Sequence, residues 1–394
     1  MAQPENGGES GIMQIMPDYR GGSIVNLMSS IVHALGGEEP LYAPLVALPP
    51  GELASRNVVL LVVDGLGYEY LRARGPEGGL ARRVRARITS VFPSTTASAV
   101  TTFLTGTAPQ QHGLTGWFMY FAELGGVMAV LPYRPRHGGS APRLAVGALL
   151  QHVPVFDRLD ARAYMVAPAR IANSDFNLAH RGRAELEAFG TLDEMFQAIE
   201  RIVHTPGGRT YVYAYWPELD RLAHEHGVGS REVSEHLDAI DAAFEAFLGR
   251  IAGSDTTVIV TADHGFIDAA PAQAIDVAAH PALARTLLLP PCGEQRAAYC
   301  YVRPQRQGAF ADYVARFADC AELHEAEALV AAGAFGLGAP HPRLHERIGD
   351  YVLIMKQNAV IKDWLPGERP FEHIGVHGSA SPQEMYVPLI VAQV

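Results

Sequence analysis

Cysteine is scarce in this sequence. There are only three cysteines in 394 residues, at positions 292, 300 and 320, and no two of them have the C-x-x-C spacing. An odd number of cysteines without that spacing argues against a disulfide framework and against a thiolate metal site. We therefore expect free, partly buried thiols in a reducing compartment.

Long apolar runs and basic runs are also missing. No stretch approaches the roughly 20 apolar residues that a membrane-spanning helix needs, and the first ten residues, MAQPENGGES, lack a basic segment followed by an apolar one. The formal net charge is -11 and no run of Lys and Arg occurs, which argues against binding a nucleic-acid polymer. These absences predict a cytoplasmic protein that contacts neither membrane nor nucleic acid. The oligomeric state stays open.

The clearest positive signal is the segment 57–67, NVVLLVVDGLG, in which the apolar run Val58–Val63 leads into Asp64. A continuous apolar run bounded by turn residues is typical of a strand buried on both faces, as in a parallel sheet. Asp64 would then stand at the carboxyl end of the strand, where open α/β sheets bind their ligands. Because a buried carboxylate is costly unless it is paired, Asp64 either caps the next helix or binds a cation.

Strand and helix patterns alternate along the chain. Apolar strands are expected at 210–215 and 257–260, and amphipathic helices at 192–203 and 231–251. This alternation predicts an α/β fold, a doubly wound, mostly parallel sheet flanked by helices, with a smaller inserted subdomain. We expect an N-terminal segment with a short helix at 1–50, a catalytic core at 51–278, an inserted or cap subdomain at 279–349, and completion of the core by strands within 350–394.

Metal-competent side chains follow three of the expected strands. Asp64 follows the first, Asp220 and His224 follow the second, and Asp263 and His264 follow the third. The carboxyl ends of parallel strands share one edge of a sheet, so these groups can converge. The D-x-x-x-H spacing places Asp220 and His224 on one face of a helical turn. Asp and His suit zinc, and also manganese.

A further candidate is His377, in the glycine-flanked segment Gly375–Gly378. Each of these signals has an ordinary structural explanation: an aspartate after a strand often caps a helix, and a single histidine is often only hydrogen-bonded. The joint pattern favours a metal centre over these separate explanations. His226 and His373 are weaker candidates.

The order of these residues resembles that of a known family. Asp64 is followed by Phe92-Pro93-Ser94-Thr95-Thr96, by Thr105-Gly106, Pro109 and His112-Gly113, and then by Asp220-x-x-x-His224, Asp263-His264-Gly265 and His377-Gly378. This order is similar to the alkaline phosphatase superfamily, and within it to the nucleotide pyrophosphatase/phosphodiesterase branch. The resemblance extends from about residue 57 to residue 391.

The resemblance implies a two-metal hydrolase of phosphodiester or pyrophosphate bonds in a small phosphorylated molecule. Two divalent ions, Zn²⁺ or alternatively Mn²⁺, would act about 4 Å apart in an in-line displacement at phosphorus. By resemblance, Thr96 is the nucleophile and forms a covalent phospho-threonine intermediate, and Ser94 and Thr95 compete for this role. The implied ligands of one metal are Asp220, His224 and His377, and those of the other are Asp64, Asp263, His264 and Thr96.

One position departs from the family pattern. The phosphodiesterase branch has an asparagine after the His-Gly segment that donates to a phosphate oxygen, and Trp117 stands close to that position here. An indole can donate one N–H or stack on a base, but it is not an amide. We therefore expect Trp117 in the substrate site, with Thr115, Asn173 or Arg170 as the replacement donor. Ordinary loop polarity is the simpler explanation of Asn173 and Arg170 taken singly.

Two alternatives follow from the same residues. A phosphonate hydrolase of the phosphonoacetate type would share the threonine and the ligand set. A degenerate, non-catalytic domain that binds a phosphorylated ligand is the alternative from another class, and it should have lost ligands, whereas none is missing in this sequence. A sulfatase is disfavoured because the motif C/S-x-P-x-R is absent.

Overall fold

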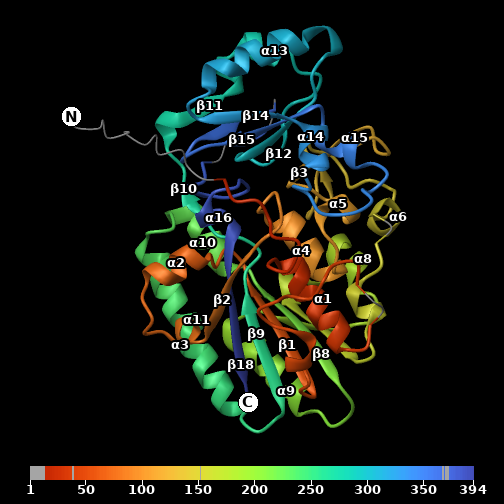
Figure 1. Cartoon of the computed structure of the whole chain (residues 1–394), viewed down its shortest axis with the longest axis vertical. Helices are drawn as coiled ribbons and strands as arrows, with labels where there is room; N and C mark the ends of the chain where they lie inside the picture. The colour runs from red at the N-terminus through yellow and green to blue at the C-terminus, as the bar shows by residue number, and fades with distance from the viewer. Residues whose placement is uncertain (1–13, 38–39, 151, 366–367, 369–371) are drawn as a thin grey trace, which may run out of the picture.

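The structure is a computed structural model, and it describes residues 14–37, 40–150, 152–365, 368 and 372–394. The centre of the fold is a seven-stranded sheet with helices on both faces (Figure 1). This arrangement confirms the predicted α/β class. The first 13 residues of the expected N-terminal segment lie outside the described residues.

The first apolar run forms the centre of this sheet. Strand β1 (Asn57–Val63) is buried along its whole length and pairs in parallel with β8 (Thr210–Trp216) and β9 (Thr256–Thr261). Asn57 lies opposite both Thr210 and Thr256, so the three strands end at the same level. The strand order is β2 (Val84–Thr89), β18 (Tyr386–Gln393), β9, β1, β8, β6 (Arg162–Pro168), β7 (Glu185–Phe189). Strand β18 runs antiparallel to both of its neighbours, β2 and β9, and the other six strands of this sheet run in one direction.

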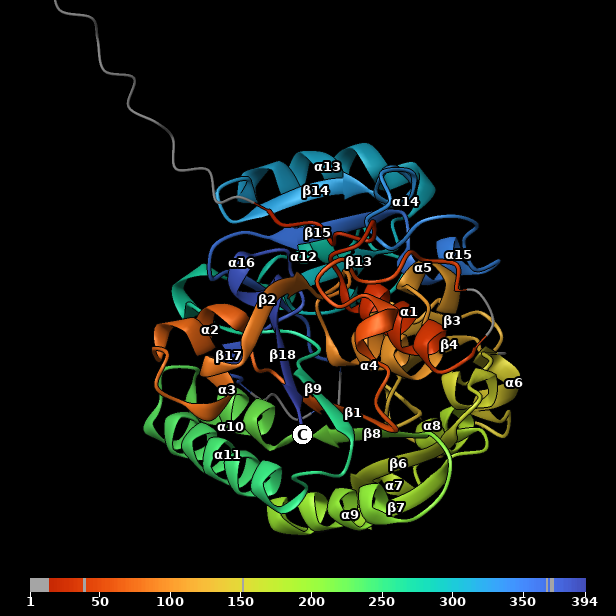
Figure 2. The ribbon, with the colours of Figure 1, turned by 60° about the horizontal axis from the view of Figure 1, so that its bottom comes forward.

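Helices cover both faces of the central sheet (Figure 2). On one side lie α9 (Leu192–His204), α10 (Glu218–His226) and α11 (Arg231–Arg250), and on the other α1 (Ile24–Ala34) and α4 (Thr96–Thr105). The amphipathic pattern explains α11, since Leu237, Ile240, Phe244 and Leu248 are its buried stripe. Among the described residues no helix is both long enough and apolar enough to cross a membrane.

A second sheet, entirely antiparallel, packs beyond the first (Figure 1). Its strands in order are β14 (Ala321–Glu325), β15 (Tyr351–Met355), β13 (Ala297–Cys300), β12 (Cys292–Gly293), β3 (Phe118–Phe121), β4 (Gly126–Ala129) and β5 (Arg134–Pro135). The expected subdomain at 279–349 thus pairs with a hairpin from residues 118–135. Strand β15 also lies in this sheet, whereas it was expected to complete the central one; a short apolar run does not reveal which sheet it joins.

One buried ion pair connects the second sheet to the central fold. Arg296, beside β13, donates two hydrogen bonds to Glu384 in α16 (Pro382–Met385), at 3.1 and 2.7 Å, and neither side chain has exposed surface. Glu384 also accepts a hydrogen bond from the backbone N–H of Ser379, at 2.9 Å. The pair therefore fixes the segment that carries His377, two residues before Ser379.

The buried ion pair leads to a stability prediction. Glu384→Gln leaves the Arg296 charge buried without its counter-charge, and breaking such a pair costs about 3–5 kcal/mol. Urea unfolding should show a loss of that size in the free energy of unfolding. The matched control is Glu187→Gln, which breaks an exposed pair with Arg201 and should change little. A Glu384→Gln protein as stable as the control would contradict the structural role of the pair.

Candidate metal centre

The predicted ligands converge where the three central strands end. Asp64 directly follows β1, and its backbone N–H bonds to the carbonyl of Trp216 at the end of β8, at 2.9 Å. Asp220 and His224 lie one turn apart on α10, which follows β8, and their side chains approach to 3.4 Å. Asp263 and His264 follow β9 and are fully buried. The common strand register is what brings these residues to one edge.

His264 stands at the middle of the cluster. Its Nε2 lies 3.4 Å from Asp64 Oδ1, 3.4 Å from Asp263 Oδ2 and 4.0 Å from Asp220 Oδ1. The ring of His377 stacks on that of His264, with centroids 3.6 Å apart. Carboxylates from three different segments thus surround one imidazole nitrogen.

Two overlapping groups have ligand atoms within 4.8 Å of one another: Asp64, Asp263 and His264, and Asp220, His264 and His377. The first matches the implied ligands of one metal. In the second, His264 stands where His224 was expected, although His224 Nε2 is only 3.4 Å from Asp220 Oδ1. The structure therefore brings all six side chains together, and His264 lies between the two groups.

Backbone carbonyls orient all three histidines in the same way. Nδ1 of His224 bonds to the carbonyl of Gly375 at 2.8 Å, Nδ1 of His264 to that of Gly265 at 3.1 Å, and Nδ1 of His377 to that of Ser94 at 3.2 Å. A carbonyl can only accept, so Nδ1 carries the proton and Nε2 offers a lone pair. This arrangement is typical of histidines that ligate a metal.

The unpaired oxygens of the cluster test whether it fits a metal. Asp64 Oδ1, Asp220 Oδ1 and Asp263 Oδ2 are buried and have no hydrogen-bond partner among the described residues. Buried carboxylate oxygens are costly when they are unpaired. Three such oxygens and three oriented imidazole nitrogens make a donor set that suits Zn²⁺ or Mn²⁺. The residues present therefore fit divalent metal ions.

Electrostatics within the cluster agree with this fit. Burial, followed by the charges of Asp220 and Asp263, raises the pKa of Asp64 well above its usual value. Burial also raises the pKa of Asp220 to about 7, and the Arg170 charge is one of the groups that oppose the rise. Burial lowers the pKa of His224 to about 4, and burial together with the neighbouring histidines lowers the pKa of His377 well below its usual value. His224 and His377 are therefore neutral near pH 7, as ligation requires.

Thr96 is the hydroxyl that faces the cluster. It begins α4, and its Oγ lies 3.1 Å from His264 Nε2. The competing hydroxyls are engaged elsewhere, since Ser94 donates to the carbonyl of Ser379 and Thr95 donates to the carboxylate of Glu294, both at 2.6 Å. Of the three candidate nucleophiles, Thr96 alone points at the predicted ligands.

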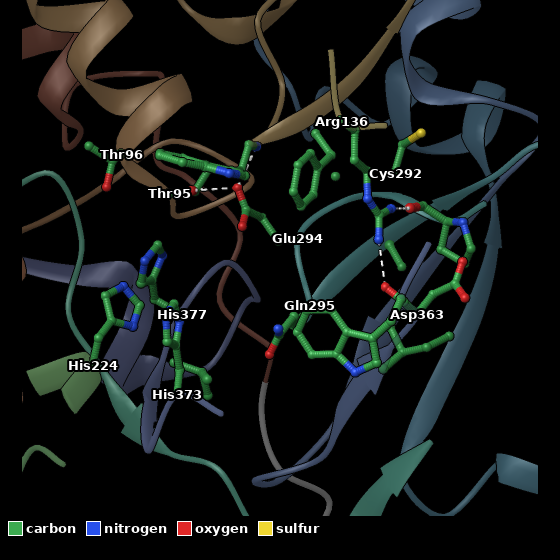
Figure 3. Close-up of a pocket in the computed structure, with 18 of the residues that line it drawn as sticks. Thr95, Thr96, Arg136, His224, Cys292, Glu294, Gln295, Asp363, His373 and His377 are labelled. Atoms are coloured by element: carbon green, nitrogen blue, oxygen red, sulfur yellow. Dashed lines mark hydrogen bonds between the residues drawn. The ribbon is translucent and has the colours of Figure 1, made fainter. Parts of the chain in front are cut away.

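Two cavities open on either side of the cluster, and Thr96, Trp117, Asp220 and His224 line both. The first, of about 420 Å³, is bounded by the second sheet and is here named the antiparallel-side cavity (Figure 3). The second, of about 880 Å³, is bounded by β6, β8 and the helices after them and is named the parallel-side cavity. The cluster of candidate ligands thus has an open cavity on each side.

The three expected substrate contacts differ in position. Trp117 lines both cavities, and Arg170, in α7 (Ala169–Ala172), lines the parallel-side cavity. Asn173 is exposed at the end of α7 and is not among the residues that line either cavity.

Two residues near the centre were not singled out from the sequence. The hydroxyl of Tyr215 donates to Asp64 Oδ2. The sequence offered a signal for it, because Tyr215 is the last residue of the strand expected at 210–215. The Oε1 of Glu294 accepts from Thr95 Oγ at 2.6 Å and from the backbone N–H of Trp117 at 2.7 Å. No local pattern indicates Glu294, since long-range pairing of the second sheet brings it here.

The raised pKa of Asp220 predicts a pH-dependent stability in metal-free protein. The pKa of this carboxyl group is about 3.9 in the unfolded chain and about 7 in the folded protein. Between these two pH values the folded state binds more protons than the unfolded state, so the free energy of unfolding falls as the pH rises. Thermal unfolding in EDTA should show wild type losing more stability than Asp220→Asn between pH 5 and pH 8. The lowered histidine pKa values act in the opposite direction in both proteins, and identical profiles would contradict the assignment.

Comparisons with known proteins agree with this geometry. The family described as type I phosphodiesterase / nucleotide pyrophosphatase matches residues 58–380. No curated protein matches the sequence.

Two solved structures illustrate the likeness of fold. Murine ectonucleotide pyrophosphatase / phosphodiesterase 5, as an inactive variant in complex with AMP, is similar with a TM-score of 0.62 and 15% identity over 84% of this chain and 87% of its own. Phosphonoacetate hydrolase from Sinorhizobium meliloti 1021, in complex with phosphonoformate, is similar with a TM-score of 0.61 and 16% identity, over 86% and 90%.

The family match covers most of the chain, and it includes every residue of the cluster. The fold, the order of the ligands and the family match therefore lead to one conclusion: this chain belongs to the type I phosphodiesterase / nucleotide pyrophosphatase family, phosphoric ester hydrolases of the alkaline phosphatase superfamily.

Proposed function

We propose that this protein hydrolyses a phosphodiester or pyrophosphate bond of a small molecule through a covalent phospho-threonine intermediate on Thr96. The observation that carries the proposal is the position of the Thr96 hydroxyl, 3.1 Å from His264 Nε2 and beside carboxylate oxygens that have no partner among the described residues. A nucleophile directed at a set of metal ligands is the arrangement that in-line phosphoryl transfer uses.

The ligands proposed for two divalent ions, most simply Zn²⁺, are Asp64, Asp263 and His264 with Thr96 on one side, and Asp220, His224 and His377 on the other. When bound, such ions lower the pKa of the nucleophile and stabilise charge on the phosphoryl and leaving oxygens. Support comes from the oriented Nε2 atoms and the unpaired oxygens. Tyr215 would hold Asp64 in place through its hydroxyl.

The chain itself supplies positioning. Thr96 stands in the first turn of α4, where backbone N–H groups without helical partners and the helix dipole favour an anionic phosphoryl group. The new Oγ–P bond forms as the bond to the leaving oxygen breaks, and water then releases the phosphoryl group and restores the hydroxyl. Trp117 and Arg170 line the cavities beside Thr96 and are proposed to contact the substrate. Asn173, exposed beyond the cavity, would reach only a substrate that extends past α7.

Phosphonate hydrolysis is the second candidate, because the same nucleophile and ligands would serve it and phosphonoacetate hydrolase shares the fold. Rates for a phosphate diester, a phosphate monoester and phosphonoacetate on one preparation would separate these activities. We expect the rate of hydrolysis to be highest for the phosphate diester.

The nucleophile proposal is tested by substitution. Thr96→Ala should lower the turnover of bis(p-nitrophenyl) phosphate by at least about 10³-fold, as removal of a covalent nucleophile does, while Thr96→Ser should keep part of it. The control is Thr107→Ala, just beyond the end of α4. A non-catalytic domain would show no turnover at all, so absence of hydrolysis by metal-loaded wild type would refute the proposal that this protein is an enzyme. Unchanged turnover in Thr96→Ala would refute the nucleophile alone.

A further inference from the structure

The two cavities beside Thr96 differ in the charges that line them. In the parallel-side cavity, Arg134 of β5 and Arg170 of α7 are exposed, and neither forms an ion pair with another described residue. The glutamates that line the same cavity are already paired: Glu225 with Arg221 at 2.6 Å, and Glu372 with Lys362 at 3.4 Å. Two guanidinium groups, supplied by different layers of the fold, thus remain available for an anion.

The antiparallel-side cavity has the opposite character. Its one arginine, Arg136, is paired with Glu368 at 3.1 Å, donates to the carbonyls of Pro291 and Asp363, and lies 4.4 Å from the ring centre of Phe118. No other Lys or Arg is among the described residues that line this cavity, whereas the carboxyl groups of Glu294 and Asp363 do line it. An anionic group that entered here would find no unpaired Lys or Arg among the described lining residues, and it would meet three carboxyl groups, those of Glu294, Asp363 and Asp220.

Glu294 lines this cavity and is held there by two hydrogen bonds (Figure 3). Its Oε1 accepts hydrogen bonds from the Thr95 hydroxyl and from the backbone N–H of Trp117, and these two bonds fix the orientation of the carboxyl group. Its side chain also packs against Gly378, where an added Cβ would come within 2.8 Å of the Glu294 Cβ. Thr96, His224 and His377 lie beside it in the same cavity. Glu294 therefore presents a carboxyl group in the same cavity as the proposed nucleophile.

We propose that the two cavities select by charge between the two arms of the substrate, that is, the groups on either side of the phosphoryl group that reacts at Thr96. An arm with a second anionic group enters the parallel-side cavity and binds Arg134 and Arg170, and an arm with a hydrogen-bond donor, most strongly an ammonium group, enters the antiparallel-side cavity and binds Glu294. This inference rests on the proposed function, since it takes the phosphoryl group to lie at Thr96 between the cavities. The indole rings of Trp117 and Trp364 line the antiparallel-side cavity and suit a cation or a flat group.

The test uses binding to zinc-loaded Thr96→Ala protein, so that no probe is turned over. Isothermal titration calorimetry at pH 8, above the Glu294 pKa of about 7 that burial causes, compares three probes: inorganic phosphate, inorganic pyrophosphate and O-phosphoethanolamine. Arg134→Gln and Arg170→Gln should each weaken pyrophosphate binding by about tenfold, the size of one charge-assisted hydrogen bond, and leave phosphoethanolamine unchanged. Glu294→Gln, which keeps an oxygen to accept both hydrogen bonds, should weaken phosphoethanolamine by about tenfold and not weaken pyrophosphate.

The control Arg201→Gln removes the same charge from α9, where Arg201 is exposed and paired with Glu187, and should change none of the three affinities. If Glu294→Gln weakens all three probes equally, Glu294 only positions the segments of Thr95 and Trp117, and the charge-sorting inference is wrong. Equal loss of phosphate and pyrophosphate binding in the arginine variants would overturn it too. Hydrolysis of a diester by wild type, lost in Thr96→Ala, would sustain the proposed function in either case.

Discussion

The mutual repulsion of three carboxylates is the constraint on which this structure depends. Asp64, Asp220 and Asp263 direct oxygens without hydrogen-bond partners among the described residues toward one imidazole, that of His264. Burial and the neighbouring charges raise the pKa of Asp64, which shows how poorly the polypeptide alone accommodates the ionised group. The divalent cations that we propose would supply the missing counter-charge and so stabilise this arrangement.

The surrounding fold can be understood as the means of holding these groups together. Equal strand register places three strand ends at one level, and carbonyl partners fix each histidine ring. Close backbone packing is needed as well: a Cβ at Gly265 would come within 2.1 Å of the Gln383 carbonyl oxygen and 2.8 Å of the Gly67 Cα. Glycine after His264 therefore lets the β9 loop pack against the segment before α2 (Tyr68–Ala73) and against α16. The Arg296–Glu384 pair extends the same support to the His377 segment.

Much of this centre could be predicted from the sequence because its determinants are local. An apolar run that ends at Asp64, the four-residue spacing of Asp220 and His224, and the rule that parallel strands end at one edge were enough to predict the convergence that the structure shows. The position of His264 between both ligand groups could not be predicted, since adjacent residues in a loop have no fixed direction.

The features missed from the sequence depend on long-range pairing. The antiparallel sheet joins residues 118–135 to strands beyond residue 290, and that pairing alone brings Glu294 to Thr95 and Trp117. Strand β15 was expected in the central sheet because its five apolar residues do not indicate which strand they pair with, and in the structure it pairs with β13. The features that distinguish the two cavities therefore come from tertiary structure, whereas the proposed catalytic centre comes from local sequence.

Anomalous X-ray diffraction at the zinc edge, from crystals of protein grown with zinc, tests the central claim most directly. The account predicts two peaks, one bounded by Asp64, Asp263 and His264 and one bounded by Asp220, His224 and His377, with Thr96 directed toward the first. The absence of any peak among these residues would contradict it.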